Sequence, residues 1–319
     1  MITQVHFILT YMCTLSYEHC FVCSSPDAEG TFHPGQINQV LDQAKDTGTV
    51  DTVYFERGEP FLFYPLLIES IRQARRRKFS VGVVTNGFFA TSEENARLFL
   101  EPLADLGIVD LSISDDIFHY ENRNDNPARR AFRVAQEMGL PVSVLALDPG
   151  ASGPDTPGSS REEKTGIVEG GGIMFRGRAA EKLSPYTVCR DWQQFTRCPY
   201  EDLVTPGRLH VDAMGTLQIC QGISIGNVWE QPLNELLRRY DPVSHPICGP
   251  LVRGGPAELS RTLGCVPPAK VSDACHLCYL VRKEKRQSNQ AVLTPLQVYC
   301  ERGGVPVTGF TVPARVRKP

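Results

Sequence analysis

The sequence contains no long apolar run and no large excess of charge of either sign. None of its hydrophobic stretches reaches the ~20 residues that a helix needs to cross a bilayer. The run Val5–Leu9 is too short and too polar for a signal peptide. A net charge of −3 gives no reason to expect nucleic acid or a membrane as partner. We therefore expect a cytoplasmic protein, and its 319 residues allow one large and one smaller domain.

Cysteine is absent from the middle of the chain. Three of the 11 cysteines lie within the first 23 residues, none lies between Cys23 and Cys189, and eight follow from Cys189 onward. In a reducing compartment, an odd and high number of cysteines is more typical of metal binding than of disulfide bonds. The distribution predicts two metal sites on two domains, at residues 1–183 and 184–319.

The first half of the chain alternates between strand-like and helix-like segments. Strands are predicted at Val5–Leu9, Thr52–Phe55, Ser80–Val84, Val109–Ile113, Val142–Leu147 and Gly172–Phe175, and helices at Gln36–Thr47, Leu62–Lys78, Ser92–Leu106 and Pro127–Met138. Strands separated by such helices pair in parallel. The pattern predicts an α/β fold with a partial (β/α)6 barrel, open on one side because a full barrel has eight units. The Gly- and Pro-rich segment 149–171 is predicted to be a rim loop that acts as a lid.

Cys13, Cys20 and Cys23 follow the first predicted strand on one short loop. Three thiolates can bind three irons of a [4Fe–4S] cluster and leave the fourth iron open to a small molecule. The alternative is a structural zinc site with His19 or His6 as fourth ligand. The cysteine spacing alone leaves both open.

Polar residues follow the second, third and fourth predicted strands. They are Gly58, Glu59, Pro60, Asn86, Ser112, Ser114, Asp115 and Asp116. Parallel α/β folds place their sites at the carboxyl ends of strands. There a carboxylate can hold an ammonium group, hydroxyls and an amide can bind a ribose, and the two aspartates can accept a proton or anchor a substrate. Ordinary solvated turns are the alternative for each of them.

Taken together, these motifs resemble the radical S-adenosylmethionine (radical SAM) superfamily. The similarity covers roughly the first 180 residues. It includes Leu9–Cys13, Gly58–Pro60, Thr85–Gly87, the serine-rich end of strand four and Gly177–Ala179. The resemblance implies that Cys13, Cys20 and Cys23 hold a [4Fe–4S] cluster whose open iron binds SAM.

The resemblance also implies a role for the strand-end residues and a reaction. Gly58, Glu59 and Pro60 would position the SAM ammonium, and Ser112 or Ser114, with Asn86, would meet its ribose or carboxylate. An electron, supplied by a reductant such as flavodoxin or ferredoxin, would cleave SAM. The resulting 5′-deoxyadenosyl radical would abstract hydrogen from the substrate.

Three features depart from the usual family pattern. The first two cysteines are separated by six residues instead of three. Val22 stands where an aromatic residue usually packs near adenine, which makes the neighbouring Phe21 the candidate for that contact. Arg57 replaces the first glycine of the usual Gly-Gly-Glu motif.

The C-terminal cysteines resemble a SPASM/Twitch auxiliary-cluster domain. Residues 209–220 predict a hairpin around Gly215, and Cys275 and Cys278 form a Cys-x-x-Cys pair. One auxiliary [4Fe–4S] cluster is predicted, although zinc is the alternative. Its predicted ligands are Cys198, Cys220, Cys275 and Cys278. Cys248 and Cys265 could replace one of these or help to build a second cluster, whereas Cys189 and Cys300 are expected to be unligated.

These features predict a radical SAM oxidoreductase. The favoured substrate is a peptide or protein side chain, and the alternative reaction is dehydrogenation or epimerisation of a small molecule. The sequence starts directly at the first strand, without the N-terminal peptide-recognition domain of many peptide-modifying relatives. This weakens the peptide hypothesis without excluding it, because a partner could supply recognition. A non-catalytic zinc-binding scaffold is the alternative from a different class.

Overall fold

The computed structural model describes residues 1–122, 124–147, 167–169 and 172–301. A nine-stranded sheet has the order β10-β9-β8-β1-β2-β3-β4-β5-β6. Its strands are β1 Gln4–Ile8, β2 Thr52–Glu56, β3 Ser80–Thr85, β4 Asp110–Ser114, β5 Val142–Ala146, β6 Ile167–Glu169, β8 Arg208–Asp212, β9 Thr216–Cys220 and β10 Ile223–Asn227. Neighbours from β1 to β6 pair in parallel. The predicted α/β fold, a partial barrel built on parallel strands, is confirmed.

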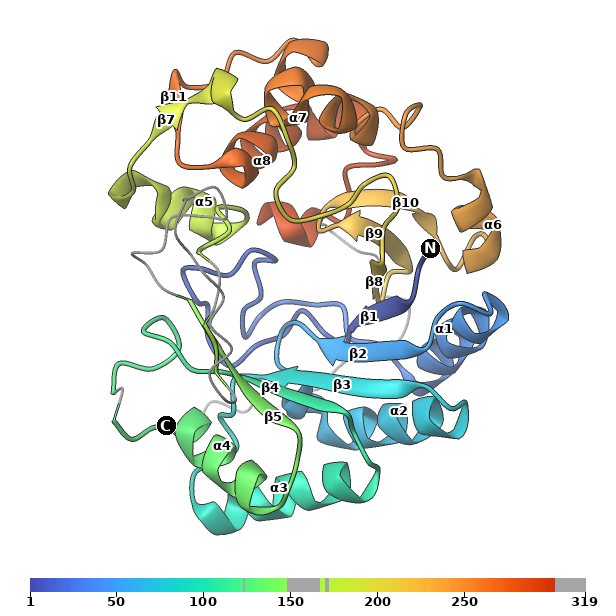
Figure 1. The fold of residues 1–319 in the computed structure, drawn as a ribbon, viewed down its shortest axis with the longest axis vertical. Helices are drawn as coiled ribbons and strands as arrows, with labels where there is room; N and C mark the ends of the chain where they lie inside the picture. The colour runs from blue at the N-terminus through green and yellow to red at the C-terminus, as the bar shows by residue number, and fades with distance from the viewer. Residues whose placement is uncertain (123, 148–166, 170–171, 302–319) are drawn as a thin grey trace, which may run out of the picture.

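Helices connect the parallel strands and cover one face of the sheet (Figure 1). They are α1 Pro34–Asp46, α2 Tyr64–Arg76 after the 3-10 turn η1 Pro60–Phe63, α3 Glu93–Asp105 and α4 Pro127–Glu137. Local sequence sets where they begin, because the side chains of Ser92 and Asn126 accept hydrogen bonds from backbone N–H groups in the first turn. The predicted helices therefore agree with the structure to within a few residues.

The sixth strand is not where the sequence predicted it. It is Ile167–Glu169, whereas residues 172–176 form no strand. The chain turns sharply there, because Gly177 has a φ of 56° and leads into α5, Arg178–Lys182. Most of the predicted lid, residues 149–166 and 170–171, lies outside the described residues.

The C-terminal half continues the same sheet. β8 pairs in parallel with β1, and β9 and β10 follow as antiparallel strands. Gly215, with a φ of 83°, makes the predicted hairpin turn. The remaining elements are β7 Arg190–Asp191, β11 Lys270–Val271, α6 Leu233–Arg239, α7 Cys248–Thr262, α8 Ala274–Lys285 and the short 3-10 turns η2 Ser184–Tyr186, η3 Trp192–Gln194, η4 Arg286–Asn289 and η5 Leu296–Tyr299. The division at residues 183 and 184 stays a prediction.

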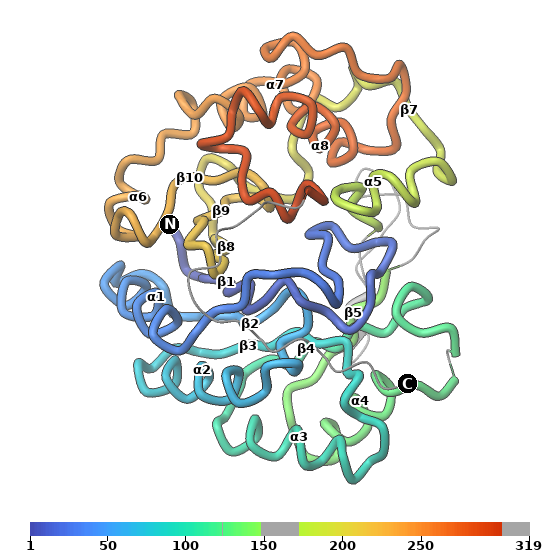
Figure 2. The backbone as a smooth tube through the Cα atoms, turned by 180° about the vertical axis from the view of Figure 1, so that it is seen from behind, coloured from blue at the N-terminus to red at the C-terminus, as the bar shows by residue number. Residues whose placement is uncertain are grey.

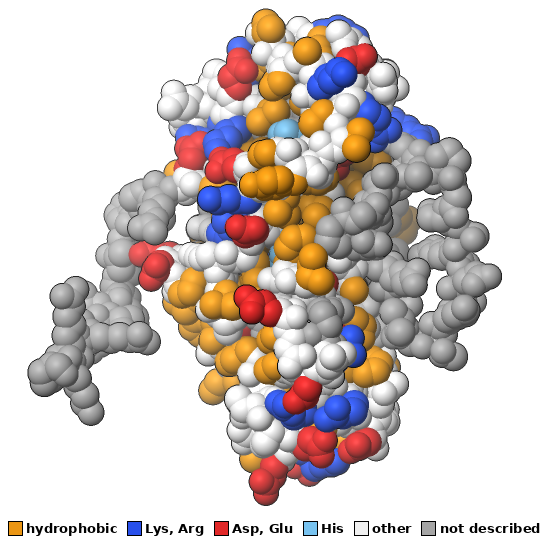
Figure 3. All heavy atoms as spheres, turned by 90° about the vertical axis from the view of Figure 1, so that its left-hand side faces the viewer, with side chains coloured by type: hydrophobic (Ala, Val, Ile, Leu, Met, Phe, Trp, Pro, Cys, Tyr) orange, Lys and Arg blue, Asp and Glu red, His pale blue; other side chains and the backbone are white. Residues whose placement is uncertain are grey.

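The long loop between β1 and α1 runs beside α5 when the molecule is seen from behind (Figure 2). Figure 3 shows the side toward which the parallel strands run, where hydrophobic side chains form a band between charged groups. In the part of the chain that the structure describes, no helix combines the length and apolar character needed to cross a membrane.

Candidate metal and cofactor centres

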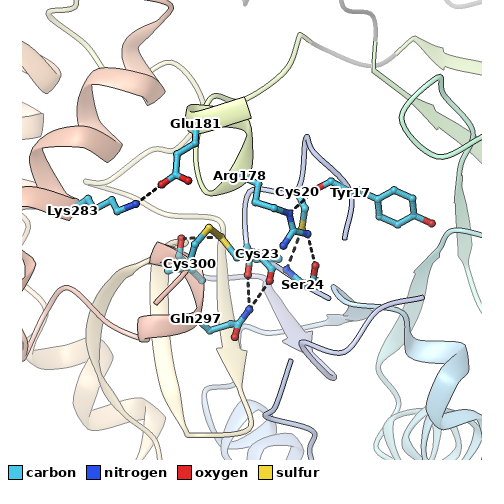
Figure 4. The surroundings of a disulfide bond; sticks show 11 residues. Tyr17, Cys20, Cys23, Ser24, Arg178, Glu181, Lys283, Gln297 and Cys300 are labelled. Carbon is cyan, nitrogen blue, oxygen red and sulfur yellow. Dashed lines mark hydrogen bonds and ion pairs between the residues drawn. A yellow bond between two sulfur atoms is a disulfide. The ribbon is translucent and has the colours of Figure 1, made fainter. Parts of the chain in front are cut away.

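The loop that carries Cys13, Cys20 and Cys23 is held from several sides. The Cys13 N–H donates to the Ser25 carbonyl at 3.0 Å, and the Arg178 N–H donates to the Cys20 carbonyl at 3.1 Å. The Arg178 guanidinium donates to the carbonyls of Tyr17 and Ser24 (Figure 4). The glycine before it allows this approach, since a Cβ at Gly177 would lie 2.8 Å from the backbone of Cys20 and Phe21. The Gly-Arg-Ala segment, which is distant from the cysteine loop in the sequence, thus holds that loop in place.

Two of the three N-terminal cysteines are free thiols in this structure. Burial raises the pKa of Cys13 to about 11. The Ser24 N–H lies 3.3 Å from the Cys20 sulfur, and the Asn86 amide lies 3.9 Å from the Cys13 sulfur. Amide donors of this kind stabilise thiolates and the sulfurs of a bound cluster.

Cys23 forms a disulfide with Cys300, which the sequence predicted to bind no metal (Figure 4). The disulfide brings Cys300 to the cysteine loop, a contact that the sequence analysis did not predict, and the unligated state of Cys300 stays a prediction. The Gln297 amide donates to the Cys23 carbonyl at 2.7 Å and fixes this contact. A sulfur in a disulfide is no thiolate ligand, so iron binding by Cys23 stays a prediction for the reduced protein.

Gly58 packs directly against the cysteine loop. A Cβ there would lie 2.3 Å from the Met12 carbonyl oxygen and 2.5 Å from that of Thr10, and the φ is 58°. The next residue, Glu59, donates its N–H to the Met12 carbonyl at 2.8 Å. Arg57 also has a left-handed φ, 70°, which explains why glycine is the usual residue there and implies local strain.

Glu59 is fully buried and joins the ends of β2 and β3. Its carboxylate accepts hydrogen bonds from the N–H groups of Phe61 and Asn86 and from the Thr85 hydroxyl, at 2.7–3.0 Å. Burial raises its pKa to about 7 although these hydrogen bonds oppose the shift. The Glu59 side chain therefore has few free lone pairs, and it supports the strand ends on which Gly58 and Asn86 lie.

Asn86 joins the third strand to the cysteine loop. Its amide donates to the Thr14 hydroxyl at 2.9 Å and the Tyr17 hydroxyl at 3.2 Å. Ser112 lies deeper, where its hydroxyl donates to Asp110 at 2.9 Å. Ser114, the last residue of β4, is half-buried. The predicted roles of these residues in SAM binding stay predictions.

Asp115 and Asp116 are both buried and hydrogen-bonded at the end of β4. Asp115 accepts from the side chains of Asn126 and Arg129, each at 3.0 Å. Asp116 pairs with His119 at 2.8 Å and lies in one group with His19. Burial alone would raise the pKa of Asp116, but His119 lowers it below its usual value. Asp115 and Asp116 are therefore not solvated turn residues, which was the alternative. The catalytic role of these two aspartates stays a prediction.

Phe21 is placed between two cations. The guanidinium carbons of Arg57 and Arg176 lie 4.6 and 5.0 Å from its ring centroid. Cation–π contact holds the ring in a fixed position beside the cysteine loop. Arg176 belongs to none of the predicted motifs, so sequence analysis missed it.

The four predicted auxiliary ligands line one cavity. Cys198, Cys220, Cys275 and Cys278 are all free thiols on its wall. Burial raises the pKa of Cys198 to about 11 and that of Cys275 well above its usual value. Three of these thiols are buried and that of Cys198 is half-buried. Four thiols around one space are the donor set of a closed [4Fe–4S] or zinc site.

Two buried arginines favour an anionic group in this cavity. Arg176 and Arg282 are 3% and 1% exposed and both line it. An Nη of Arg176 lies 2.8 Å from the Cys220 sulfur. Burial alone would lower the pKa of Arg176, but the Cys220 and Cys275 thiols raise it further than burial lowers it. A cluster with four thiolates carries net negative charge, and these two arginines would compensate it.

Cys248 and Cys265 do not line this cavity. Cys248 is buried at the start of α7, and burial raises its pKa to about 12. Cys265 has Glu284 and Lys285 as charged neighbours. Cys189 lies beside Thr187 and Ser272. The cavity therefore brings together the four predicted ligands without these three cysteines.

No family model matches the chain. The putative peptide biosynthesis protein YydG of Bacillus subtilis strain 168 is 25% identical over 107 residues, which are 34% of each chain. The tungsten-containing aldehyde ferredoxin oxidoreductase cofactor-modifying protein of Pyrococcus furiosus is 31% identical over 110 residues, 34% of this chain and 29% of that protein. The matched segment thus spans about a third of each curated relative.

Among solved structures, BtrN in complex with AdoMet and 2-DOIA is 14% identical, covers 76% of this chain and 83% of that chain, and has a TM-score of 0.47. The curated relatives and the cysteine motif confirm the sequence-based recognition. The chain is similar to radical SAM proteins of the SPASM/Twitch subgroup.

Proposed function

We propose that this protein is a radical SAM enzyme. The observation that carries the proposal is the convergence of the three-cysteine loop with Gly58, Asn86 and Arg178 at the carboxyl ends of parallel strands. A [4Fe–4S] cluster bound there supplies one-electron reduction of SAM, which yields a 5′-deoxyadenosyl radical that abstracts hydrogen from the substrate. Cys13, Cys20 and, once reduced, Cys23 are the proposed ligands.

The protein's own residues position SAM and keep water out. The backbone around Gly58 faces the cysteine loop without an intervening side chain and is the proposed seat of the SAM ammonium. Glu59, with its three hydrogen bonds, and Pro60 fix that backbone. Phe21, held by two arginines, is the proposed adenine contact. Ser114 and Asn86 are proposed to bind the ribose or carboxylate, and buried Ser112 supports β4.

The cavity with four thiols and two arginines is the proposed site of one auxiliary [4Fe–4S] cluster. Four protein thiolates close the cluster, which favours electron transfer from a substrate radical over direct substrate ligation. Arg176 touches both this cavity and Phe21, so the two centres are neighbours. The arrangement supports the proposal of an oxidative reaction, and the proposed reductant is a protein such as flavodoxin or ferredoxin.

The proposed substrate is a peptide or protein side chain. The name of YydG, a putative peptide biosynthesis protein, supports this choice. So do the exposed Leu15 and Ile117, 56% and 55% exposed on the loops after β1 and β4, which can contact an apolar segment at the barrel mouth. Oxidation or epimerisation of a small molecule is the second candidate, since the BtrN structure holds 2-DOIA.

Anaerobic purification and incubation with SAM and dithionite test the proposal. We expect about eight irons and eight sulfides per chain and formation of 5′-deoxyadenosine, lost in Cys20→Ala and kept in the control Cys189→Ala. If Cys20→Ala cleaves SAM as fast as the parent, the assignment is wrong. Zinc without sulfide would instead support the non-catalytic scaffold.

A further inference from the structure

Three side chains with metal-ligating groups meet inside the barrel, and none of them is a cysteine. His6 on β1, Glu56 on β2 and His210 on β8 come from three neighbouring strands, and His6 is the direct partner of His210 in the sheet. They are 6%, 4% and 1% exposed. Nothing in the proposed radical chemistry uses them.

The donor atoms are spaced like the ligands of one metal ion. Glu56 Oε1 lies 3.1 Å from His6 Nδ1 and 3.6 Å from His210 Nε2, and one ligand atom from each residue lies within 4.8 Å of the others. Metal–ligand bonds of about 2.0–2.2 Å at tetrahedral angles separate neighbouring ligand atoms by about 3.4 Å. Both measured distances to the carboxylate are close to that value.

The hydrogen bonding of this group is incomplete. His6 Nδ1, Glu56 Oε1 and His210 Nδ1 are buried without a hydrogen bond of normal geometry, and so is the oxygen of the neighbouring Gln221 side chain. Buried polar atoms are almost always satisfied, so these exceptions are unusual. Two contacts already occupy the donor atoms: an Nη of Arg57 lies 3.3 Å from Glu56 Oε1, and the Gln221 side-chain nitrogen lies 3.2 Å from His210 Nε2. A bound metal ion would replace them. The Nε2 of His6 pairs with the Gln4 side-chain oxygen at 3.2 Å. As a donor in that pair, it leaves the Nδ1 lone pair facing a carboxylate oxygen, which a cation between them would stabilise.

The donor types suit a divalent cation. Glu56 offers a carboxylate oxygen, and His6 and His210 each offer a ring nitrogen. Carboxylate oxygens and imidazole nitrogens are common ligands of divalent metal ions in proteins.

We propose that His6, Glu56 and His210 bind a divalent transition-metal ion such as Zn²⁺ or Fe²⁺ inside the barrel. Two imidazoles and one carboxylate are a donor set for these metals, and three protein ligands leave at least one position open. An oxygen or nitrogen atom of a substrate is the ligand that suits an open position. The metal site itself does not depend on the proposed radical chemistry.

Zinc uptake by protein whose cysteine sites are already loaded with iron and sulfide tests the proposal. We expect about one additional zinc per chain after desalting, lost in Glu56→Gln and His210→Gln at unchanged iron content. The control is His33→Gln, which replaces an exposed helix-capping histidine. X-ray absorption at the zinc edge should show only nitrogen and oxygen ligands near 2.0–2.1 Å and no sulfur near 2.3 Å.

Three outcomes would overturn the metal site. They are sulfur ligands at the zinc, no zinc uptake by the parent protein, or zinc uptake by both variants equal to that of the parent. Absent uptake would also favour a simple ion pair between Glu56 and a protonated His6. If the variants fail to fold, a zinc-soaked crystal of the unaltered protein decides the matter. An anomalous peak among the three side chains supports the site, and its absence overturns it.

Discussion

Replacing Arg176 by methionine removes a buried positive charge at the proposed auxiliary cluster. One guanidinium nitrogen lies 2.8 Å from the Cys220 sulfur, which puts the charge roughly 6 Å from the centre of a cluster bound through that sulfur. At an effective dielectric constant of about 20, a unit charge at this distance contributes about 3 kcal/mol per added electron. Since about 2.3 kcal/mol corresponds to 100 mV, the variant should lower the reduction potential by on the order of 100 mV.

A redox titration of the auxiliary cluster by electron paramagnetic resonance measures this shift. Arg176→Lys is the matched control, because it keeps the charge while losing the planar contact with Phe21. We expect its potential to stay much closer to that of the parent. A potential in Arg176→Met within about 20 mV of the parent, at equal cluster content, would refute the electrostatic argument.

Two further predictions concern the strand ends. Gly58→Ala should lower the free energy of unfolding by at least ~2 kcal/mol, because the new Cβ would meet backbone oxygens. The control Gly48→Ala, at a φ of 69° with nothing within 4 Å, should lower it by only about 1 kcal/mol. Equal losses of stability in urea denaturation would contradict the packing argument. Burial raises the pKa of Glu59 from its usual 4.5 to about 7 in the folded protein, so the folded state binds more protons than the unfolded state between these pH values. Its contribution to stability should therefore fall by about 3 kcal/mol as the pH rises from 4.5 to 7. Glu59→Gln should remove that part of the slope, while Asp212, whose pKa burial also raises to about 7, retains its own share; an unchanged slope would show that Glu59 does not titrate there.

The barrel was predictable because its signals are local. Alternating runs and caps such as Ser92 specify strands and helices over a few residues. The sixth strand was misplaced because β6 is only three residues long and lies in a Gly- and Pro-rich segment. A short strand in such a segment has too little periodicity to be recognised.

The sites were predictable only where residue type carries the chemistry. The cysteines that line the auxiliary cavity were identified from thiol spacing, and the cavity brings them together. Arg176 and the pair of Cys23 with Cys300 were not, because their contacts join residues 44 and 277 positions apart in the chain. The group of His6, Glu56 and His210 was not predicted for the same reason. The order of the strands in the sheet brings these residues side by side, and their spacing in the sequence does not reveal it.

The short turn η5 near the end of the described chain has a mechanical consequence. Gln297 binds the carbonyl of Cys23, and the Tyr299 hydroxyl binds the carbonyl of Gly222, two residues beyond Cys220. Through these two hydrogen bonds, η5 contacts the backbone of both cysteine-bearing segments. Assembly of the two centres should therefore be cooperative, since a displacement of η5 would shift both segments.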